Sequence, residues 1–475
     1  MPFSSLFFLH GFLPVFLVAY WLTPRRHANL TAVVGSLLFY AWGAPRFLPV
    51  LCAFAVVDHV LGRAIASWRE QASTRMRAKF CLSVGVVGHL ALLGYFKYAN
   101  FFVAQSNELR ARMGLGAIAW TDVILPIGIS FITFEAISYL VDVYRGDAKP
   151  ARRWSDYALF LTLFPHSIAG PIFRWKDLDG QLRDRTATHE SILRGAERFT
   201  LGLAKKVLLA DTVAITADAI FGLPWDQLSP GLAWAGAIAY TLQIYFDFSG
   251  YSDMAIGLGA MMGFTFKENF RQPYLSESLT EFWQRWHISL SSWLRDYLYI
   301  PLGGNRGGES RALRNVFIVF AVSGFWHGAA WTFIAWGAFH GLFVVAERAF
   351  AKQRARIPGA VGQLLTLLLV VVGWVFFRAA TLGHALSYLR AMAGRGATHS
   401  LTLLPGFIFP NIAILALVAG TALVLLPRWV PMMRVNDADA RSASGPMRWA
   451  YVLLFVFSSI HLVSVGTAPL IYFKF

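Results

Sequence analysis

The sequence FWQRWHISLSSWLRDYLYIPLGGNR occupies residues 282–306, and SGFWHGAAWTFIAWGAFHG follows at residues 323–341. The second stretch falls inside a run from residue 316 to residue 346 that contains no Lys, Arg, Asp or Glu. His327 and His340 lie in this run. An ionisable side chain at membrane depth needs a polar partner or a water-filled cavity, so these histidines mark a candidate functional site.

The first stretch is aromatic and amphipathic, and it carries a third histidine, His287, directly after Trp286. The wider segment 267–314 combines charged residues with Trp and Tyr. This composition is typical of helices that lie at a membrane interface or dip through it. We therefore expect His287 to lie between membrane spans rather than within one.

The composition is that of an integral membrane protein. Of the 475 residues, 56% are hydrophobic and only 14% are charged, and the mean hydropathy is +0.52, so repeated membrane spans are expected. The net charge of +16 favours loops at an anionic cytoplasmic leaflet over nucleic-acid binding. The two cysteines, Cys52 and Cys81, lie in apolar segments and suggest neither a disulfide framework nor a cysteine metal site.

Hydropathy predicts an all-α, polytopic fold in a single membrane domain over residues 1–475, with about 10–12 transmembrane helices. Residues 157–173 are apolar but carry helix-breaking Pro and Gly, so they are expected to form a re-entrant segment. The expected spans are 6–23, 29–44, 47–67, 80–96, 121–144, 199–222, 231–262, 315–331, 333–346, 361–377, 407–427 and 449–468.

Basic loops follow the first, third and fifth of these spans, which places those loops in the cytoplasm and the N-terminus outside. The first span has no basic region before it and no small-residue cleavage site, so it is expected to be retained. The basic residues of the three loops are Arg25, Arg26, Arg69, Arg75, Arg77, Lys79, Arg145, Lys149, Arg152 and Arg153.

His327 stands between Trp326 and Gly328, where bulky rings exclude water and a small residue allows close approach. A desolvated, neutral imidazole could act as a general base toward a hydroxyl. The alternative is a histidine that is hydrogen-bonded within a helix bundle. A metal site is disfavoured because His327 and His340 are thirteen residues apart and have no Cys, Asp or Glu within one helical turn.

Several charged residues are further candidates. Arg285, Arg295 and Arg306 could bind an anionic carrier, or could be cytoplasmic anchors. Asp247 and Asp253 lie in an apolar stretch and could pair with those arginines, orient a histidine, or form buried structural ion pairs.

Motifs for covalent or phosphate chemistry are lacking. GGNRGG at residues 303–308 has no Lys-Ser/Thr of a P-loop, and no G-x-S-x-G elbow occurs in the chain. A serine acyl-enzyme is therefore not supported. A positioned base suffices for direct attack of an alcohol on a thioester.

The motifs FPHSIAGPI, YFDFSGYSDMAIG, ENFRQPY, FWQRWHISLSSWLRDYLYIPLGGNR and WHGAAWTFIAWGAFHG together resemble the membrane-bound O-acyltransferase family, and within it the bacterial alginate O-acetyltransferase branch. Its core motifs cover about residues 120–380. The resemblance implies a ring of helices around a central tunnel. One departure is His166, where relatives commonly carry glutamine.

The resemblance also implies roles for individual residues. His327 matches the family's catalytic histidine, and His287 matches the second characteristic histidine of the branch. We expect no bound metal, on the spacing given above, and no tightly bound cofactor. Supporting or tunnel-lining positions are His340, Asp247, Asp253, Trp286, Trp326, Asn305, Arg285 and Arg295.

The implied activity is acyl transfer in the bacterial inner membrane, with acetyl-CoA as the cytoplasmic donor and an extracytoplasmic polysaccharide as the final acceptor. The resemblance further implies a periplasmic acetyltransferase of the serine-esterase type as partner. One alternative keeps the fold but transfers D-alanyl or lipid acyl groups from a carrier-protein thioester. Another is a proton-coupled exporter with the histidines as a relay, although matched repeat halves typical of transporters are not seen.

Overall fold

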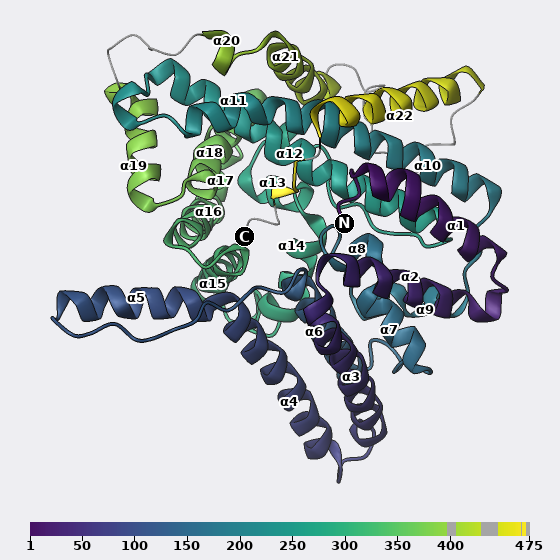
Figure 1. Ribbon diagram of the computed structural model, residues 1–475. Coiled ribbons are helices and arrows are strands. Elements are labelled where there is room, and N and C mark those ends of the chain that lie inside the picture. The colour runs from purple at the N-terminus through teal and green to yellow at the C-terminus, as the bar shows by residue number, and fades with distance from the viewer. Residues whose placement is uncertain (397–404, 429–444, 467, 472–475) are drawn as a thin grey trace. The chain divides into compact units, whose positions relative to one another are not determined.

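The computed structural model describes residues 1–396, 405–428, 445–466 and 468–471, and within these residues every regular element is a helix (Figure 1). The predicted all-α fold class is thereby confirmed. The chain forms two compact units, one of Met1–Ile192 with Leu258–Phe266 and one of Leu193–Gly257 with Lys267–Phe475. The predicted ring around a tunnel and the single domain over 1–475 stay predictions.

The first unit consists of helices joined by turns and loops, the longest of which runs from residue 113 to residue 128. Its helices are η1 (Phe8–Phe12), α1 (Leu13–Leu22), η2 (Arg25–His27), α2 (Ala28–Gly43), η3 (Pro45–Phe47), α3 (Leu48–Arg69), α4 (Arg75–Leu93), η4 (Gly94–Tyr98), α5 (Ala99–Arg112), α6 (Ile129–Arg145), α7 (Trp154–Thr162), α8 (Phe164–Ser167) and α9 (Trp175–Arg183).

Helices α3, α4 and α6 pack against one another through small residues (Figure 1). A Cβ atom on Gly62 of α3 would lie 2.2 Å from the hydroxyl of Tyr139 on α6, and one on Gly85 of α4 would lie 2.4 Å from Leu140. Close approach of backbones at small residues is the usual way in which membrane helices associate.

The helix break that the sequence predicts within residues 157–173 is present. Helix α7 ends at Thr162, Leu163 leaves the helical region with ψ 108°, and Pro165 opens the single turn α8. Residues 168–174 are then non-helical up to the start of α9. The interruption of the helix is confirmed, whereas the re-entrant placement at membrane depth stays a prediction.

The second unit contains the histidine-bearing segments and most of the longest helix. Its helices are α10 (His189–Ala204), η5 (Lys205–Ala210), α11 (Asp211–Phe221), η6 (Trp225–Gln227), α12 (Pro230–Met261), η7 (Pro273–Leu275), α13 (Leu279–Arg285), α14 (Ile288–Leu294), η8 (Arg295–Tyr299), α15 (Glu309–His327), α16 (Trp331–Ala349), α17 (Ala351–Arg354), α18 (Gly359–Arg378), α19 (Leu382–Arg390), η9 (Ala391–Arg395), α20 (Pro405–Ile408), α21 (Asn411–Leu425), η10 (Leu426–Arg428) and α22 (Gly445–Val465). The longest helix is α12; the first residues of α10 and the last residues of α12 belong to the first unit.

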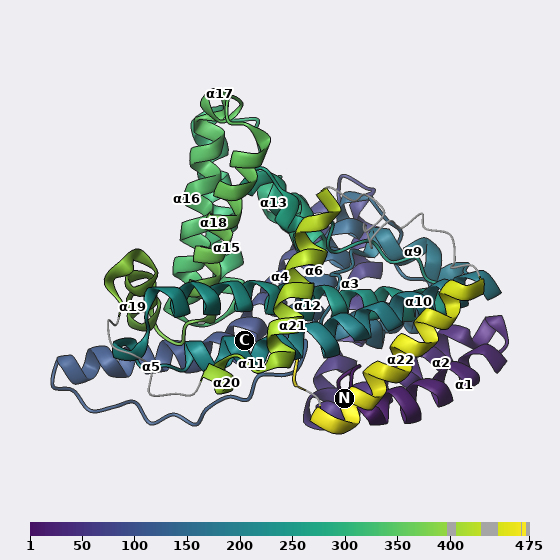
Figure 2. The same ribbon diagram turned by 90° about the horizontal axis from the view of Figure 1, so that it is seen from above.

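Helices α15 and α16 form a tight hairpin, and α18 packs beside α16 (Figure 2). The hairpin is close because glycines face each other. A Cβ atom on Gly324 would lie 2.5 Å from the carbonyl oxygen of Phe333, and one on Gly337 would lie 2.5 Å from that of Phe320. These contacts are with backbone atoms, which cannot rotate away as a side chain can.

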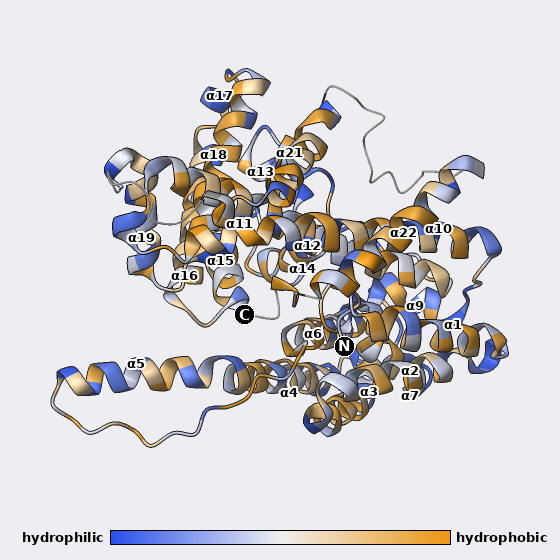
Figure 3. Cartoon of the chain, turned by 45° about the horizontal axis from the view of Figure 1, so that its top comes forward, coloured by the Kyte–Doolittle hydropathy of each residue, from blue (hydrophilic) through white to orange (hydrophobic). Residues whose placement is uncertain are grey.

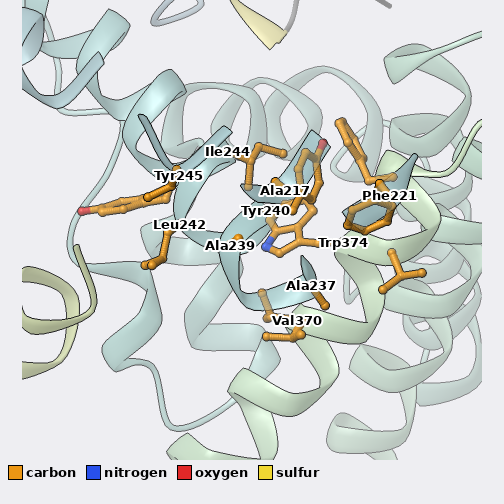
Figure 4. Packing of buried hydrophobic residues seen from close by; sticks show 14 of the residues in the cluster. Ala217, Phe221, Ala237, Ala239, Tyr240, Leu242, Ile244, Tyr245, Val370 and Trp374 are labelled. Carbon is orange, nitrogen blue, oxygen red and sulfur yellow. The ribbon is translucent and has the colours of Figure 1, made fainter. Parts of the chain in front are cut away.

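A large aromatic and aliphatic core joins α11, α12, α18 and α19 (Figure 4). Phe221 and Tyr388 stack with ring centroids 4.3 Å apart. Tyr240 and Trp374 are buried in the same core. This core holds α18 in place beside the histidine-bearing hairpin.

Five described helical segments are long and apolar enough to cross a membrane: Pro45–Arg69, Arg75–Arg112, Gly359–Arg378, Asn411–Arg428 and Gly445–Val465. Hydrophobic residues predominate along most helices, while hydrophilic residues gather at short segments such as helix α17 (Figure 3). Several large hydrophobic side chains on these segments are exposed, as expected for helices that face lipid.

Several predicted spans differ from the structure in their bounds, for example 199–222, which lies in a helical stretch that begins already at His189, and 315–331, which corresponds to α15 (Glu309–His327). The span expected at 121–144 begins only at Ile129, because Pro126 and the left-handed Gly128 (φ 77°) interrupt the chain before it. The span expected at 80–96 belongs to a helical segment that continues through the π-turn η4 to Arg112.

Candidate functional site

His287 occupies the junction between α13 and α14. It is the N-cap of α14 and adopts a left-handed backbone conformation with φ 45° and ψ 54°, one of two non-glycine residues with positive φ among the described residues. Its side chain is 1% exposed, and its ring meets Phe248 edge to face at 4.7 Å. A strained conformation at a buried histidine is typical of a functional position.

Asn269 fixes the orientation of the His287 ring. The Asn269 Oδ1 atom accepts hydrogen bonds from the backbone N–H of Ser289 at 3.2 Å and from its hydroxyl at 2.9 Å, and the amide nitrogen donates to Ser252 Oγ at 3.0 Å. Since this oxygen is an acceptor, the His287 Nδ1 atom 3.1 Å away is the donor. The neutral ring therefore carries its lone pair on Nε2.

Desolvation disfavours the charged form of this histidine. Burial lowers the pKa of His287 to about 3. The imidazole is therefore neutral at physiological pH, which is the form that a general base or a proton shuttle needs.

His327 is the last residue of α15, and the chain continues in an extended conformation at Gly328. The His327 side chain is 5% exposed. Its ring meets Trp336 edge to face at 5.0 Å and Phe377 at 5.3 Å. A Cβ atom on Gly328 would lie 2.2 Å from the Phe333 ring, so the small residue predicted to allow close approach is sterically required.

Trp326 brings the two histidines into one neighbourhood. Its indole centroid lies 4.9 Å from the ring of His327 and 6.5 Å from the ring of His287. Because forty residues separate His287 from His327, the sequence alone did not show whether they lie close together. The structure places both imidazoles beside the same indole.

His340 extends the cluster along α16. It is fully buried, and its ring meets Trp283 and Trp336 at 5.1 Å each. Neither of its ring nitrogens has a hydrogen-bond partner among the described residues. A Cβ atom on Gly373 of α18 would lie 2.5 Å from His340 Nε2, so the ring fills the space that this glycine leaves open.

The model of the membrane-bound O-acyltransferase family matches residues 152–382. A probable alginate O-acetylase of Pseudomonas aeruginosa is 50% identical over 398 residues, which cover 83% of this chain and 75% of the relative. The chain belongs to the membrane-bound O-acyltransferase family. It is an O-acyltransferase and a multi-pass membrane protein.

Two further relatives support the assignment to the membrane-bound O-acyltransferases. A probable alginate O-acetylase of Azotobacter vinelandii is 44% identical over 512 aligned positions, which cover 100% of both chains. A peptidoglycan O-acetyltransferase of Helicobacter pylori is 36% identical over 428 positions, which cover 82% of this chain and 80% of the relative.

The predicted pairing of Asp247 and Asp253 with Arg285, Arg295 or Arg306 is wrong for this membrane-bound O-acyltransferase. Both aspartates are buried and pair with basic residues of α10 and η5. This outcome agrees with the alternative of buried structural ion pairs. The contacts are Asp247 with Lys206 at 2.7 Å, and Asp253 with Arg198 at 2.7 Å and with Lys205 at 2.6 Å.

Three of the other candidates lie in more exposed surroundings. Arg285 pairs with Glu281 at 2.6 Å, and Arg295, whose side chain is 62% exposed, pairs with Asp296 at 2.9 Å. Asn305 accepts hydrogen bonds from the Tyr299 hydroxyl at 2.5 Å and from Arg348 at 2.7 Å. In the described part of the chain, none of these contacts joins them to the histidine cluster.

Trp286 is a core residue. It is 1% exposed and packs among Phe270, Phe282 and Trp374, with ring centroids between 4.9 and 5.6 Å away. Because Trp286 directly precedes His287 in the chain, this packing fixes the backbone next to the histidine. Its contribution to the site is therefore one of support.

Sequence reasoning missed Asn269, although it lies in the quoted motif ENFRQPY. It also missed Lys205 and Lys206, whose presence inside the apolar stretch 199–222 was the available signal. In the first unit, His166 forms a fully buried pair with Glu135, Nδ1 to Oε1 at 2.8 Å. That acidic partner gives a physical context for histidine at this position.

The described residues contain no group of three or more His, Cys, Asp or Glu side chains placed to hold a metal ion. The chemistry that the cluster offers is that of buried imidazoles beside aromatic rings. Such groups can accept a proton from a hydroxyl and return it to a leaving group.

Proposed function

We propose that this protein is an O-acetyltransferase of the bacterial inner membrane that serves the O-acetylation of an extracytoplasmic polysaccharide. The acetyl donor is a cytoplasmic thioester, acetyl-CoA. The relatives in Pseudomonas and Azotobacter carry the name of alginate O-acetylases, and the Helicobacter relative that of a peptidoglycan O-acetyltransferase. Acetyl transfer to a polysaccharide is common to these names.

The observation that carries the proposal is the placement of His287 and His327 beside Trp326. In the proposed reaction His327 removes the proton of the attacking hydroxyl. The oxygen then bonds to the thioester carbonyl carbon, the carbon–sulfur bond breaks, and the proton passes to the leaving thiolate. No serine acyl-enzyme is required.

His287 has a defined part in this scheme. Its Nδ1–H is directed to Asn269, so Nε2 is the nitrogen available for accepting and returning a proton. We assign it the task of shuttling the proton or orienting the donor, and His340 a supporting role through packing. The acceptor at the site is either the sugar itself or a periplasmic acetyltransferase of the serine-esterase type that completes the transfer.

The test is the O-acetyl content of exported polysaccharide, measured by NMR in cells that carry wild type, His327→Ala or His287→Ala. The amount of protein in the membrane is measured in parallel. His189→Ala serves as the matched control, because His189 is an exposed histidine at the start of α10. Acetylation should be lost in the two cluster variants and kept in the control.

Two outcomes would overturn the assignment. Full acetylation in the His327 variant would remove its role as base. Loss of polymer export with acetylation retained on the remaining polymer would instead favour the exporter.

A further inference from the structure

The first unit contains a strongly basic cavity of about 700 Å³ at the turn between α1 and α2. It is bordered by that turn and by the segments 152–156 and 182–187. Six arginines and two aspartates line it, namely Arg25, Arg26, Arg152, Arg153, Arg183, Arg185, Asp156 and Asp184. We call it the arginine pocket.

Four of these arginines have no carboxylate partner in the described part of the chain: Arg25, Arg26, Arg152 and Arg153. Arg183 differs, because it pairs with Asp179 at 2.5 Å. The positive charge in the pocket is therefore largely uncompensated by the protein. Guanidinium groups in this situation are well suited to phosphate, which they bind in a bidentate manner.

Arg185 supplies a second, independent observation. Its guanidinium is held in place, because Nε donates to the Tyr20 hydroxyl at 3.1 Å, Nη1 donates to Asn29 Oδ1 at 2.7 Å, and the group lies 4.0 Å from the Phe264 ring centroid. The remaining nitrogen, Nη2, is buried and has no hydrogen-bond partner among the described residues. A buried charged donor of this kind favours an anionic acceptor.

A second cavity, of about 710 Å³, lies between the faces of α1 and α2. Its lining is apolar apart from Thr31 and the first residue of the chain, and includes Val15, Val34, Leu38 and Trp42. We call it the apolar groove. Leu30 lines both the groove and the arginine pocket, so the two cavities are neighbours.

We propose that the arginine pocket and the apolar groove together bind one anionic phospholipid. The phosphate lies in the pocket against Arg152, Arg153 and the Nη2 atom of Arg185, and an acyl chain lies along the groove. The positive-inside rule predicts that the loops carrying these arginines face the cytoplasm, where the leaflet is rich in anionic lipid. A site that joins an apolar channel to a cationic pocket matches both parts of such a lipid.

The test uses the full-length protein purified in detergent, with lipid binding followed by native mass spectrometry. Phosphatidylglycerol should bind more tightly than phosphatidylcholine of the same chain length. The Arg152→Gln/Arg153→Gln double variant should bind phosphatidylglycerol roughly 25-fold more weakly, at about fivefold per arginine. Val34→Trp, which fills the groove from an exposed position, should weaken the binding of both lipids.

A matched control separates the pocket from net charge. Arg75→Gln/Arg77→Gln removes the same charge from exposed positions on α4, outside both cavities, and should leave lipid binding unchanged. The melting temperature of each variant without added lipid reports whether it is folded.

Three results would overturn the proposal. The first is equal binding of the two lipids by wild type. The second is equal loss of binding in the pocket and control variants. The third is binding of soluble glycerol phosphate as tight as that of phosphatidylglycerol, with no effect of Val34→Trp, which would identify a site for a small phosphate compound instead of a lipid.

Discussion

The Nδ1 atom of His287 lies 3.1 Å from the Oδ1 atom of Asn269, and this contact determines which ring nitrogen is basic. Ser289 donates two hydrogen bonds to the same oxygen. The oxygen is thereby held as an acceptor, and the histidine must donate through Nδ1. Asn269 thus acts as a positioning residue for a histidine that we place in the reaction.

We expect Asn269→Ala to reduce the rate of acetyl transfer about 10- to 100-fold, because the His287 ring loses the partner that sets its tautomer. In Asn269→Asp the acceptor returns with a negative charge, which favours the imidazolium form. This variant should recover part of the rate and shift the acidic limb of the pH–rate profile upward. An unshifted profile for Asn269→Asp would show that Asn269 does not act through His287.

The stability of the second unit should depend on pH through His287. Burial lowers its pKa to about 3, whereas a histidine in an unfolded chain has a pKa of about 6.5. Below about pH 6.5 the unfolded state binds the extra proton, so the free energy of unfolding should fall by up to about 1.4 kcal/mol per pH unit. No such contribution is expected above that pH.

Thermal unfolding of wild type and His287→Gln between pH 5 and pH 7.5 measures this effect. The loss of melting temperature on acidification should be smaller in the variant, because one titrating group has been removed. Parallel curves for the two proteins would contradict the prediction.

Gly373→Ala should destabilise the protein by about 1–3 kcal/mol, because the added methyl group would lie 2.5 Å from Nε2 of His340 and displace its ring. Gly383→Ala is the matched control, since a Cβ atom there meets only Thr381 Oγ1 at 3.8 Å. Denaturation in detergent should give a lower midpoint for the first variant and an unchanged or higher midpoint for the second. Equal midpoints would show that His340 is not held against Gly373.

Lys206→Met should lower the free energy of unfolding by about 3–5 kcal/mol, because it leaves a buried carboxylate without its cation. Lys206 lies 2.6 Å from Asp211 and 2.7 Å from Asp247, and the Asp247 side chain is 2% exposed. Adding Asp247→Asn to this variant should restore part of the lost stability, because it removes the unpaired negative charge.

Arg112→Gln provides the comparison at the surface. Its partner is Glu108 at 2.7 Å, and the two side chains are 74% and 55% exposed. The free energy of unfolding should therefore change by no more than about 1 kcal/mol. A Lys206→Met effect as small as that of Arg112→Gln would show that the buried pair contributes nothing specific.

The helical fold was predictable from sequence because hydropathy and periodicity are local properties. The helix from Pro230 to Met261 matches its expected span within a residue, and the interruption at Leu163 followed from nearby Pro and Gly. The late start at Ile129 depended on the left-handed conformation of Gly128, which hydropathy does not report. Short elements such as the π-turn η5 are likewise set by their packing.

The site was predictable only in part. His327 and Trp326 stood out because an apolar run contained them, but their approach to His287 depends on tertiary packing. Nothing in the sequence around Asn269 marks it as part of a site. Its role follows from its contact with the His287 ring. Asp247 and Asp253 form the buried structural ion pairs that the sequence allowed as one alternative, but their partners Lys206 and Lys205 follow only from tertiary packing.

The glycine contacts between α15 and α16 have a dynamic consequence. With the backbones touching at Gly324 and Gly337, neither helix can slide past the other without a steric clash, and the hairpin moves as one rigid body. We expect His327 and His340, which both lie on this hairpin, to keep their spacing when the protein moves. We therefore expect any rearrangement that admits or releases a substrate to involve the short helices around His287, where the backbone has a left-handed conformation.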